Sequence, residues 1–418
     1  MVMSGQTPPD PYRAVAERYV KLVLAVGQHD GDYVDAFYGP AEWRTQAEAA
    51  KRPLAEIDRD AAEAVEQLTT IAVKPDSRDA EMWSLRRQYL SRQLAALRSR
   101  VAMLQGTRLT FDEESKALYD AVAPVKPESE FEAVVSQLAA ALPGDGPLIE
   151  RYDRFKQQFI IPTNRLDRVF QQAIRACRER TPGVNLPLQE RFTVEYVTNK
   201  AWGGYNWYQG NFKSLIQVNT DLPVYIDRAI DLACHEGYPG HHVYNALLEK
   251  TLVKDRGWIE YTVYPLFSPQ SLIAEGTANY GIDVAFPLPA RLTFERDVLF
   301  PLAGLNPERV AEYYTVLGLV QRLSYAGNEA ARNYLDGKID RAAAIAWMEK
   351  YALQTRPRAE QWLKFVEQYR SYVINYNLGK DLVRAYVEKR MGRDQTPQRR
   401  WAEFMALLSS PRLPSELK

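Results

Sequence analysis

The chain has 418 residues, 46% of them hydrophobic, and its 53 lysines and arginines balance its 53 aspartates and glutamates. This length can bury a large core and allows two or three domains or one large two-lobed unit. The charge balance excludes the strongly basic surface that attracts nucleic acids or anionic membranes, so we expect neither as a partner.

Cysteine content and hydropathy bear on the compartment. The chain contains only two cysteines, Cys177 and Cys234, and low cysteine content is typical of proteins from a reducing compartment. The apolar run at residues 22–26 is too short to cross a bilayer. We therefore expect a cytoplasmic protein in which Cys234 packs in the core.

The first part of the chain has the periodicity of amphipathic helices. Apolar residues recur at spacings of three and four from Leu90 to Leu104, and Gly106 ends this stripe. Further helices are predicted over residues 11–27, 41–72, 111–122, 129–142 and 148–180. We take residues 1–185 as an N-terminal helical region.

The pattern then changes to one that favours strands. Residues 192–197 are rich in β-prone residues and largely alternate between apolar and polar side chains, and residues 214–219 form a second candidate strand. Residues 201–210, rich in aromatic side chains and glycine, are predicted to be the loop between them. The pattern predicts a small antiparallel sheet, whose exposed edge could bind an extended peptide through main-chain hydrogen bonds. A purely structural hairpin explains the same pattern.

Three of the four histidines of the chain lie in one octapeptide, from His235 to His242 with the sequence HEGYPGHH. Histidine is the most common metal ligand in proteins. A His-Glu pair followed by another histidine is similar to the H-E-x-x-H zinc helix, in which two histidines bind the metal and the glutamate is the base. In this chain, however, Pro239 stands where the second histidine of that motif would be.

The spacing excludes a regular helix as the carrier of a two-histidine site. His241 follows His235 by six residues, which turns its ring away, and His242 lies about 10 Å further along the axis than His235. Pro239 removes a backbone donor and Gly240 tolerates unusual dihedral angles, so a bulge here would return His241 to the register of a ligand. The alternative is a helix that ends before Pro239 and a polar turn with two surface histidines.

A third ligand is expected, because catalytic zinc usually has three protein ligands and one open position. Ser268 and Pro269 predict the N-cap and first residue of a helix, which places Glu275 two turns inside it. Small and apolar residues flank Glu275, and a buried carboxylate needs a partner. Glu275 is therefore the candidate third ligand, and the alternative is a core ion pair with an arginine.

The octapeptide and the segment EGTANY at residues 275–280 resemble the motifs of a known family, the bacterial domain of unknown function 885. The layout of its motifs is similar to that of gluzincin metallopeptidases such as thimet oligopeptidase and carboxypeptidase Taq. The resemblance implies a mainly α fold with a small antiparallel β-sheet, in a large helical two-lobed architecture with a central cleft. It also implies one Zn2+ ion, held by His235, His241 and Glu275. Members of the family often carry Trp and Leu at the positions of Thr277 and Asn279, so the pocket wall is expected to differ.

The remainder of the chain, residues 186–418, is the predicted catalytic region. It would comprise the sheet at 190–220, the metal-site helices at 223–290 and C-terminal helices at 305–410, integrated with the N-terminal region into one unit. The segment from Tyr325 to Gly327 resembles a Tyr-x-Gly segment of the same family. A tyrosine or arginine opposite the metal commonly polarises the substrate carbonyl. The candidates for this role are Tyr325, Tyr376, Arg322 and Arg370.

These residues predict a zinc-dependent hydrolase. Among such enzymes, we favour a metallopeptidase that acts on a peptide or another small amide. A metal-bound water attacks the carbonyl, and Glu236 accepts its proton as general base and passes it to the leaving amine. His242 is expected to orient the oxyanion, to replace His241 as ligand, or to hydrogen-bond a neighbouring ligand. Two alternatives remain: a hydrolase of non-peptide amides or esters, and a non-catalytic protein that binds a metal or a partner.

Overall fold

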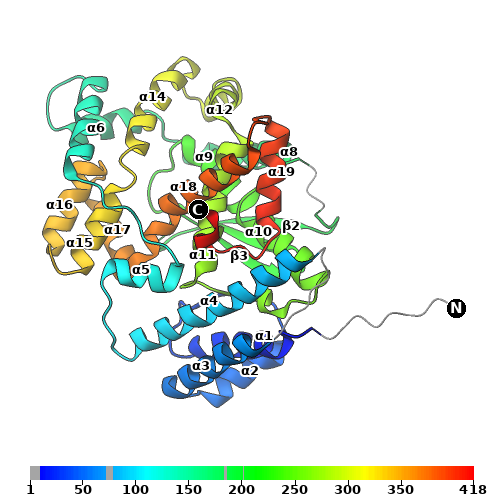
Figure 1. The fold of residues 1–418 in the computed structure, drawn as a ribbon. Helices are drawn as coiled ribbons and strands as arrows, with labels where there is room; N and C mark the ends of the chain where they lie inside the picture. The colour runs from blue at the N-terminus through cyan, green and yellow to red at the C-terminus, as the bar shows by residue number, and fades with distance from the viewer. Residues whose placement is uncertain (1–9, 72–78, 183–185, 201) are drawn as a thin grey trace.

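The computed structural model describes residues 10–71, 79–182, 186–200 and 202–418. Most of these residues are helical, and two small β-sheets complete the fold (Figure 1). The predicted mainly helical fold with a small sheet is therefore confirmed. The predicted boundary between the two regions, at residue 185, lies outside the described residues.

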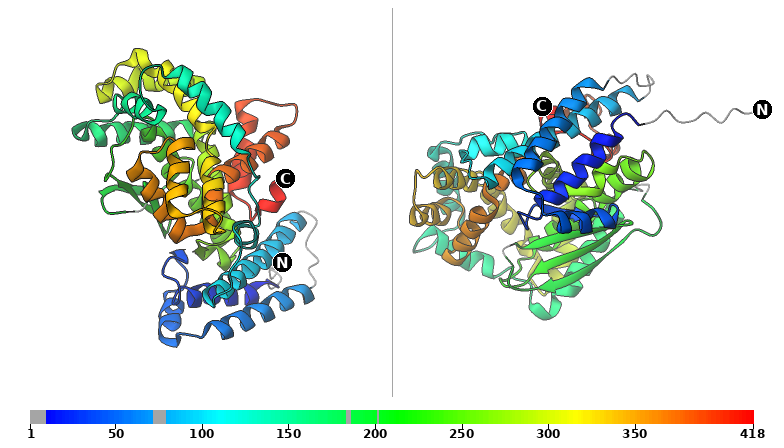
Figure 2. Two further views of the ribbon diagram at one scale, coloured as in Figure 1. Left: turned by 90° about the vertical axis from the view of Figure 1, so that its left-hand side faces the viewer. Right: turned by 90° about the horizontal axis from the view of Figure 1, so that it is seen from below.

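The first helices form a layer at one side of the molecule, drawn in blue in Figures 1 and 2. They are α1 (Arg13–Val26), α2 (Ala41–Ala50), α3 (Leu54–Thr70) and α4 (Ala80–Leu104). The predicted stripe lies on α4, where Leu90, Leu94 and Leu97 are buried. The chain continues through α5 (Phe111–Tyr119), α6 (Glu128–Ala141), α7 (Leu148–Gln157) and α8 (Thr163–Arg180).

A three-stranded sheet precedes the histidine octapeptide. Its strands are β2 (Arg191–Val197), β3 (Gly204–Gly210) and β4 (Lys213–Asn219), in the order β2-β4-β3. β3 and β4 are antiparallel and joined by a tight turn at Asn211 and Phe212, both with positive φ. The two strands predicted from the sequence, β2 and β4, are present but run parallel to each other.

The segment predicted as a loop is therefore strand β3 from Gly204 onward, and this prediction was wrong. Its side chains do alternate, since Asn206 and Tyr208 are buried whereas Trp207 is exposed. The glycines at its start and end are typical of turns and conceal the alternation. Because β3 takes the hairpin position beside β4, β2 pairs with the other edge of β4.

The second sheet joins parts of the chain that are far apart in sequence. Its strands, β1 (Val34–Phe37) and β5 (Val263–Pro265), pair antiparallel. This pairing brings β1, which includes Asp35, toward the helices that carry the histidines.

The helices around the octapeptide are short and irregular. They are α9 (Asp227–Leu232), the π-helical turn η1 (Ala233–Gly237), α10 (His241–Leu248), a second π-helical turn η2 (Glu249–Lys254) and the 3-10 turn η3 (Ile259–Thr262). The next helix, α11 (Pro269–Ala285), has Ser268 as its N-cap and Pro269 in its first turn, as predicted, and almost all of its residues are buried.

The C-terminal part is helical throughout. It comprises α12 (Leu288–Phe294), η4 (Glu295–Leu299), α13 (Phe300–Ala303), η5 (Pro307–Arg309), α14 (Val310–Gln321), α15 (Ala326–Leu335), α16 (Arg341–Tyr351), α17 (Arg356–Tyr369), η6 (Arg370–Val373), α18 (Ile374–Met391), α19 (Pro397–Leu408) and η7 (Pro414–Leu417). α11 and α18 cross at two glycines: a Cβ atom on Gly276 would lie 2.5 Å from the carbonyl of Gly379. This close crossing places the start of α18 beside Glu275.

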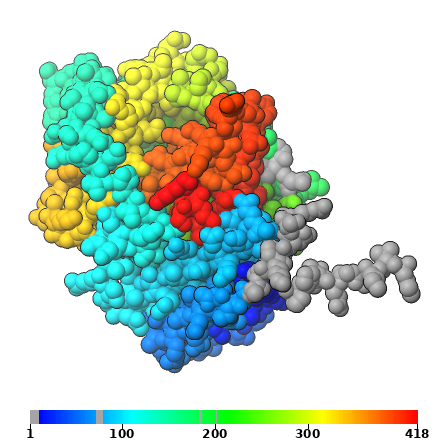
Figure 3. All heavy atoms as spheres, viewed as in Figure 1, coloured from blue at the N-terminus to red at the C-terminus, as the bar shows by residue number. Residues whose placement is uncertain are grey.

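The end of the chain packs against the N-terminal helices. Arg412 pairs with Glu81 of α4, and the two segments meet on the face shown in Figure 3. Among the residues that the structure describes, no helix is both long enough and apolar enough to cross a lipid bilayer.

Candidate metal centre

The histidine octapeptide is a helix that breaks and restarts. α9 widens into the π-helical turn η1, which carries His235, and α10 begins at His241. Between them, the N–H of Gly240 donates to the carbonyl of Cys234 at 2.9 Å, and the peptide bond before Pro239 is cis. A Cβ atom on Gly240 would lie 1.8 Å from the carbonyl oxygen of His235, so only glycine fits. This interruption lets two histidines six residues apart face each other.

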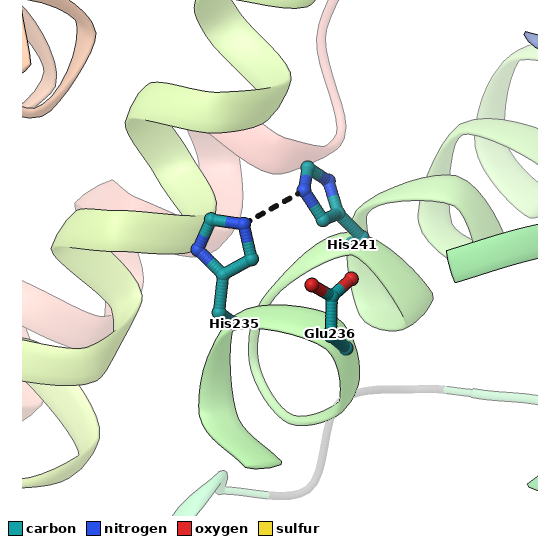
Figure 4. A group of neighbouring side chains, drawn as sticks. All are labelled: His235, Glu236 and His241. Carbon is teal, nitrogen blue, oxygen red and sulfur yellow. Dashed lines mark hydrogen bonds between the residues drawn. The ribbon is translucent and has the colours of Figure 1, made fainter. Parts of the chain in front are cut away.

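The two imidazoles and the carboxylate of Glu275 converge on one point. The Nε2 atoms of His235 and His241 are 3.1 Å apart (Figure 4). Glu275 Oε2 lies 3.2 Å from Nε2 of His235 and 3.6 Å from Nε2 of His241. Donor atoms bound tetrahedrally to zinc at its usual bond lengths are separated by about 3.3 Å. The triangle of donor atoms therefore has the size that a metal ion requires.

Glu275 has one satisfied oxygen and one without a partner. Tyr372, at η6, donates to its Oε1 at 2.8 Å. Its buried Oε2, which points toward the two imidazoles, accepts no hydrogen bond from the described residues. Burial alone would raise the pKa of Glu275, but the neighbouring histidines hold it well below its usual range. The carboxylate is therefore ionised, as a metal ligand must be.

His241 is coupled to this carboxylate. Burial alone would lower the pKa of His241, but the charge of Glu275 raises it to about 9. Because only the neutral imidazole binds a metal ion, binding at this site would displace a proton. Two imidazoles and a carboxylate form a donor set that is found at zinc sites and also at sites of other transition metals such as iron.

Glu236 lies at the same point from a different side. His235, Glu236 and His241 form a group whose ligand atoms are within 4.8 Å of one another and which could hold a metal ion (Figure 4). Burial raises the pKa of Glu236, and the charge of Glu275 adds to this rise. A Cβ atom on Gly204 would lie 3.0 Å from Glu236 Oε1, so strand β3 packs directly against the carboxylate. Two carboxylates, Glu236 and Glu275, are thus close enough to complete a site with the histidines.

His242, although next to His241, faces the other way. Its Nδ1 is 2.9 Å from the hydroxyl of Ser214 on β4, and its Nε2 is 3.4 Å from a carboxylate oxygen of Glu190. The ring is fully buried between α10 and the sheet. The structure therefore places His241, and not His242, beside His235.

Two other predicted residues have partners away from the histidines. Tyr325 donates to Asp381 at 2.7 Å, and Arg370 pairs with Glu114 of α5. The remaining candidates, Tyr376 and Arg322, line a cavity of about 890 Å³ that contains the histidines.

Tyr376 lies on the cavity wall, close enough to Glu275 and Glu236 for both charges to affect its pKa. Burial raises its pKa, and the charges of Glu275 and Glu236 raise it further. Its hydroxyl therefore remains protonated at neutral pH and can donate a hydrogen bond in the cavity. On the same wall, α17 contributes Trp362, Phe365 and Tyr369.

Sequence reasoning missed two residues of the candidate centre, Asp35 and Tyr372. Asp35 lines the cavity from β1 and accepts a hydrogen bond from the hydroxyl of Tyr205 on β3. Burial raises the pKa of Asp35 to about 6. Tyr372, which supports Glu275, lies one helical turn before the predicted Tyr376, so the helical period could have suggested it. No local signal indicates Asp35, because the pairing of β1 with β5 brings it to the site.

The two cysteines form a disulfide between α8 and η1, next to His235. The low number of cysteines therefore does not support the predicted reducing compartment, because disulfides persist mainly in oxidising compartments. Cys234 is buried as predicted, but as half of a cross-link rather than as a packing residue alone. From sequence, two cysteines 57 residues apart carry no sign that they meet.

No family model matches this chain, and no curated protein matches it. A crystal structure from Colwellia psychrerythraea, described as that of a "putative lipoprotein", is similar in fold, with a TM-score of 0.52 and 15% sequence identity. The similarity covers 86% of this chain but 65% of that one. At this identity the similarity concerns the fold alone. The resemblance to gluzincins accordingly rests on the residues of the two motifs.

Proposed function

We propose that the protein is a zinc-dependent hydrolase that cleaves peptide bonds. The observation that carries the proposal is the triangle of donor atoms from His235, His241 and Glu275, with the carboxylate of Glu236 beside it in a large cavity. These three residues would hold the zinc ion, which when bound supplies Lewis acidity that activates water and polarises a carbonyl.

Glu236 is the proposed general base. Its carboxylate accepts a proton from the attacking water and returns it to the nitrogen of the leaving amine. The raised pKa of Glu236 suits this task, because a carboxylate that must take up and release a proton works best when its pKa is near the working pH. The main-chain carbonyl of Glu236 accepts a hydrogen bond from Asn206 at 2.8 Å, which fixes the residue against β3.

Tyr376 is the proposed donor to the substrate carbonyl. Its hydroxyl stays protonated and lies on the cavity wall beside the carboxylates. A donor aimed at an oxygen that gains negative charge stabilises the transition state more than the ground state.

A peptide is the substrate that the cavity wall favours. Gly203, Gly204 and Asn206 of the β3 segment line the cavity next to Glu236. Because β3 is an edge strand of its sheet, its main chain can pair with an extended peptide without selecting side chains.

The test is hydrolysis of a mixture of unmodified peptides by the zinc-loaded protein, followed by mass spectrometry, with Glu236→Gln as the matched variant. We expect cleavage by the wild type, loss of about 10²–10⁴-fold in turnover in Glu236→Gln, and unchanged zinc content in that variant. Full activity of Glu236→Gln would refute its role. If the protein cleaves esters or small amides but no peptides, it is a hydrolase of those compounds and not a peptidase.

We also infer that the protein works in an oxidising, extracytoplasmic compartment. The disulfide between Cys177 and Cys234 supports this inference. So does the similar fold of a chain described as a lipoprotein. Alkylation of free thiols at harvest from native cells, followed by intact-mass measurement, tests it. An oxidised pair is expected, and two alkylated cysteines would contradict it.

A further inference from the structure

The charges that line the cavity are unevenly distributed. Three carboxylates, Asp35, Glu236 and Glu275, lie at the end that holds the histidines. The remainder of the wall has an excess of positive charge, because its three carboxylates, Asp231, Asp283 and Asp381, are outnumbered by six basic side chains: Arg228, Arg291, Arg322, Arg358, Lys380 and Arg384. A cavity with this polarity favours a ligand whose anionic group lies away from the metal centre.

Most of the basic side chains are already paired. Arg291 pairs with Asp231 at 2.8 Å and with Glu295 at 3.0 Å. Lys380 and Arg384 share Asp283, at 2.9 and 2.7 Å. Arg228 shares Asp231 with Arg291, at a longer distance of 3.2 Å.

Arg322 has no carboxylate partner among the described residues either, but it is exposed and donates to Gln137 at 2.7 Å. Arg358 differs from these five. It lies in the first turn of α17, is half-buried, and donates to the main-chain carbonyl of Pro223 at 3.3 Å. Within the part of the chain that the structure describes, no carboxylate oxygen lies within 4.0 Å of its guanidinium. A half-buried guanidinium without an anionic partner is the side chain on this wall that most needs one.

Other cations surround Arg358. The guanidinium of Arg358 and the ammonium of Lys156 both lie over the ring of Tyr225, at 5.4 and 3.8 Å from its centroid. Burial lowers the pKa of Lys156; the charge of Asp227 opposes this fall, and the charges of Arg358 and Arg228 add to it. Asp227 offsets part of the positive charge here, and a bound anion would offset more of it.

The separation from the metal centre sets the size of the ligand. Arg228 precedes His235 by seven residues, or about 10 Å along α9 and η1. One face of α17 leads from Arg358 past Trp362 and Phe365 to Tyr369 at the acidic end. Along α17, Arg358 precedes Tyr369 by eleven residues, or about 16 Å. An extended peptide advances about 3.3 Å per residue, so about three to five residues span distances of about 10 to 16 Å.

We propose that Arg358, with Arg228 beside it, binds the C-terminal carboxylate of a peptide whose scissile bond lies at the metal centre. The planar guanidinium matches a carboxylate through two parallel hydrogen bonds. The enzyme would then release short C-terminal fragments: the elements of water add across the C–N bond, hydroxyl to the carbonyl carbon and hydrogen to the amine nitrogen. This inference rests on the proposed peptidase function and narrows it to an exopeptidase.

The experiment compares peptides of three to eight residues that end in a free carboxylate, in an amide, or in an amide after an acidic last residue. The variants are Arg358→Gln and a matched control, Arg356→Gln. Arg356 lies on the same helix, is 63% exposed and pairs with Glu360 at 3.3 Å, and it does not line the cavity. For free-carboxylate peptides we expect Arg358→Gln to raise KM roughly tenfold to a hundredfold with little change in kcat. Arg356→Gln should behave as the wild type.

Two outcomes would overturn the proposal while the peptidase function stands. One is equal cleavage of amidated and free peptides, or cleavage at internal bonds far from the C-terminus. The other is full rescue by an acidic last side chain, which would mean that Arg358 recognises a side chain.

If no peptide is cleaved, the proposed function fails, and calorimetric binding of the same peptides to the zinc-loaded protein tests the subsite separately. Binding that needs the free carboxylate and is lost in Arg358→Gln supports the subsite. Binding independent of the carboxylate, or none, overturns it.

Discussion

Two clusters of histidine and glutamate lie on opposite sides of the start of α10. One cluster faces the cavity, and the other faces the sheet. On one face, His235, His241 and Glu275 line the cavity, and one oxygen of Glu275 lacks a hydrogen-bond partner among the described residues. On the other face, His242 and Glu190 are buried against the sheet.

The second cluster is mostly closed by its own partners, although Nε2 of His242, 3.4 Å from Glu190, makes no hydrogen bond to the described residues. Glu190 accepts a hydrogen bond from Tyr238 and lies 3.5 Å from Arg178, and Ser214 holds the other nitrogen of His242. Residue type alone therefore does not identify a candidate metal site. Converging donor atoms, a carboxylate oxygen without a partner and access to a cavity favour metal binding, and only the first cluster has all three.

The strongest test of this comparison is the pair His241→Ala and His242→Ala. We expect His241→Ala to lower zinc affinity by at least about a hundredfold, because it removes one of three ligands. His242→Ala should keep its zinc but lose about 1–3 kcal/mol of unfolding free energy, because Ser214 and Glu190 are left with an unfilled partner position. Elemental mass spectrometry and urea unfolding measure the two effects. Loss of zinc in His242→Ala alone would reverse the assignment of the clusters.

Gly240→Ala tests the turn that separates the two faces. The new Cβ would lie 1.8 Å from the carbonyl oxygen of His235 and 2.5 Å from that of Cys234, and both are backbone atoms that cannot move aside. We expect a loss of about 4 kcal/mol or more in unfolding free energy, together with loss of zinc. Gly318→Ala in α14 is the matched control, since nothing lies within 4 Å of its Cβ and alanine stabilises a helix by about 0.5–1 kcal/mol. If Gly240→Ala changes neither the unfolding free energy nor the zinc content, the turn is not rigid.

The parts of this site that the sequence predicts are those encoded locally. The helix with Glu275 follows from its N-cap and first-turn proline, and the break before His241 follows from Pro239 and Gly240. The parts that it does not predict depend on contacts between distant segments. β3 brings Tyr205, and the pairing of β1 with β5 brings Asp35, to the cavity. The glycines at the ends of β3 conceal its alternation, and β1 and β5, with four and three residues, are too short to show one.

The disulfide also joins segments that are distant in sequence. We expect its removal to lower the unfolding free energy by less than Gly240→Ala does. Replacing both Cys177 and Cys234 by alanine should lower the unfolding free energy by about 2–4 kcal/mol, because the unfolded chain regains the freedom of a long loop. Zinc content should persist, since the turn at Gly240 still orients His235. Denaturant unfolding beside zinc analysis measures both. Loss of zinc without loss of stability would show that the cross-link acts mainly on the metal centre.

The smallest expected effect comes from two tyrosines, each of which donates a hydrogen bond to the carboxylate of one cluster. Tyr372 donates to Glu275, and Tyr238 donates to Glu190. Tyr372→Phe should weaken zinc binding by about tenfold, because a ligand loses the hydrogen bond that orients it. Tyr238→Phe should leave zinc affinity unchanged and lower the unfolding free energy by about 1–2 kcal/mol. Competition with a zinc chelator resolves a tenfold change. Equal zinc affinities in the two variants would mean that Glu275 is held by the packing of α11 against α18 rather than by Tyr372.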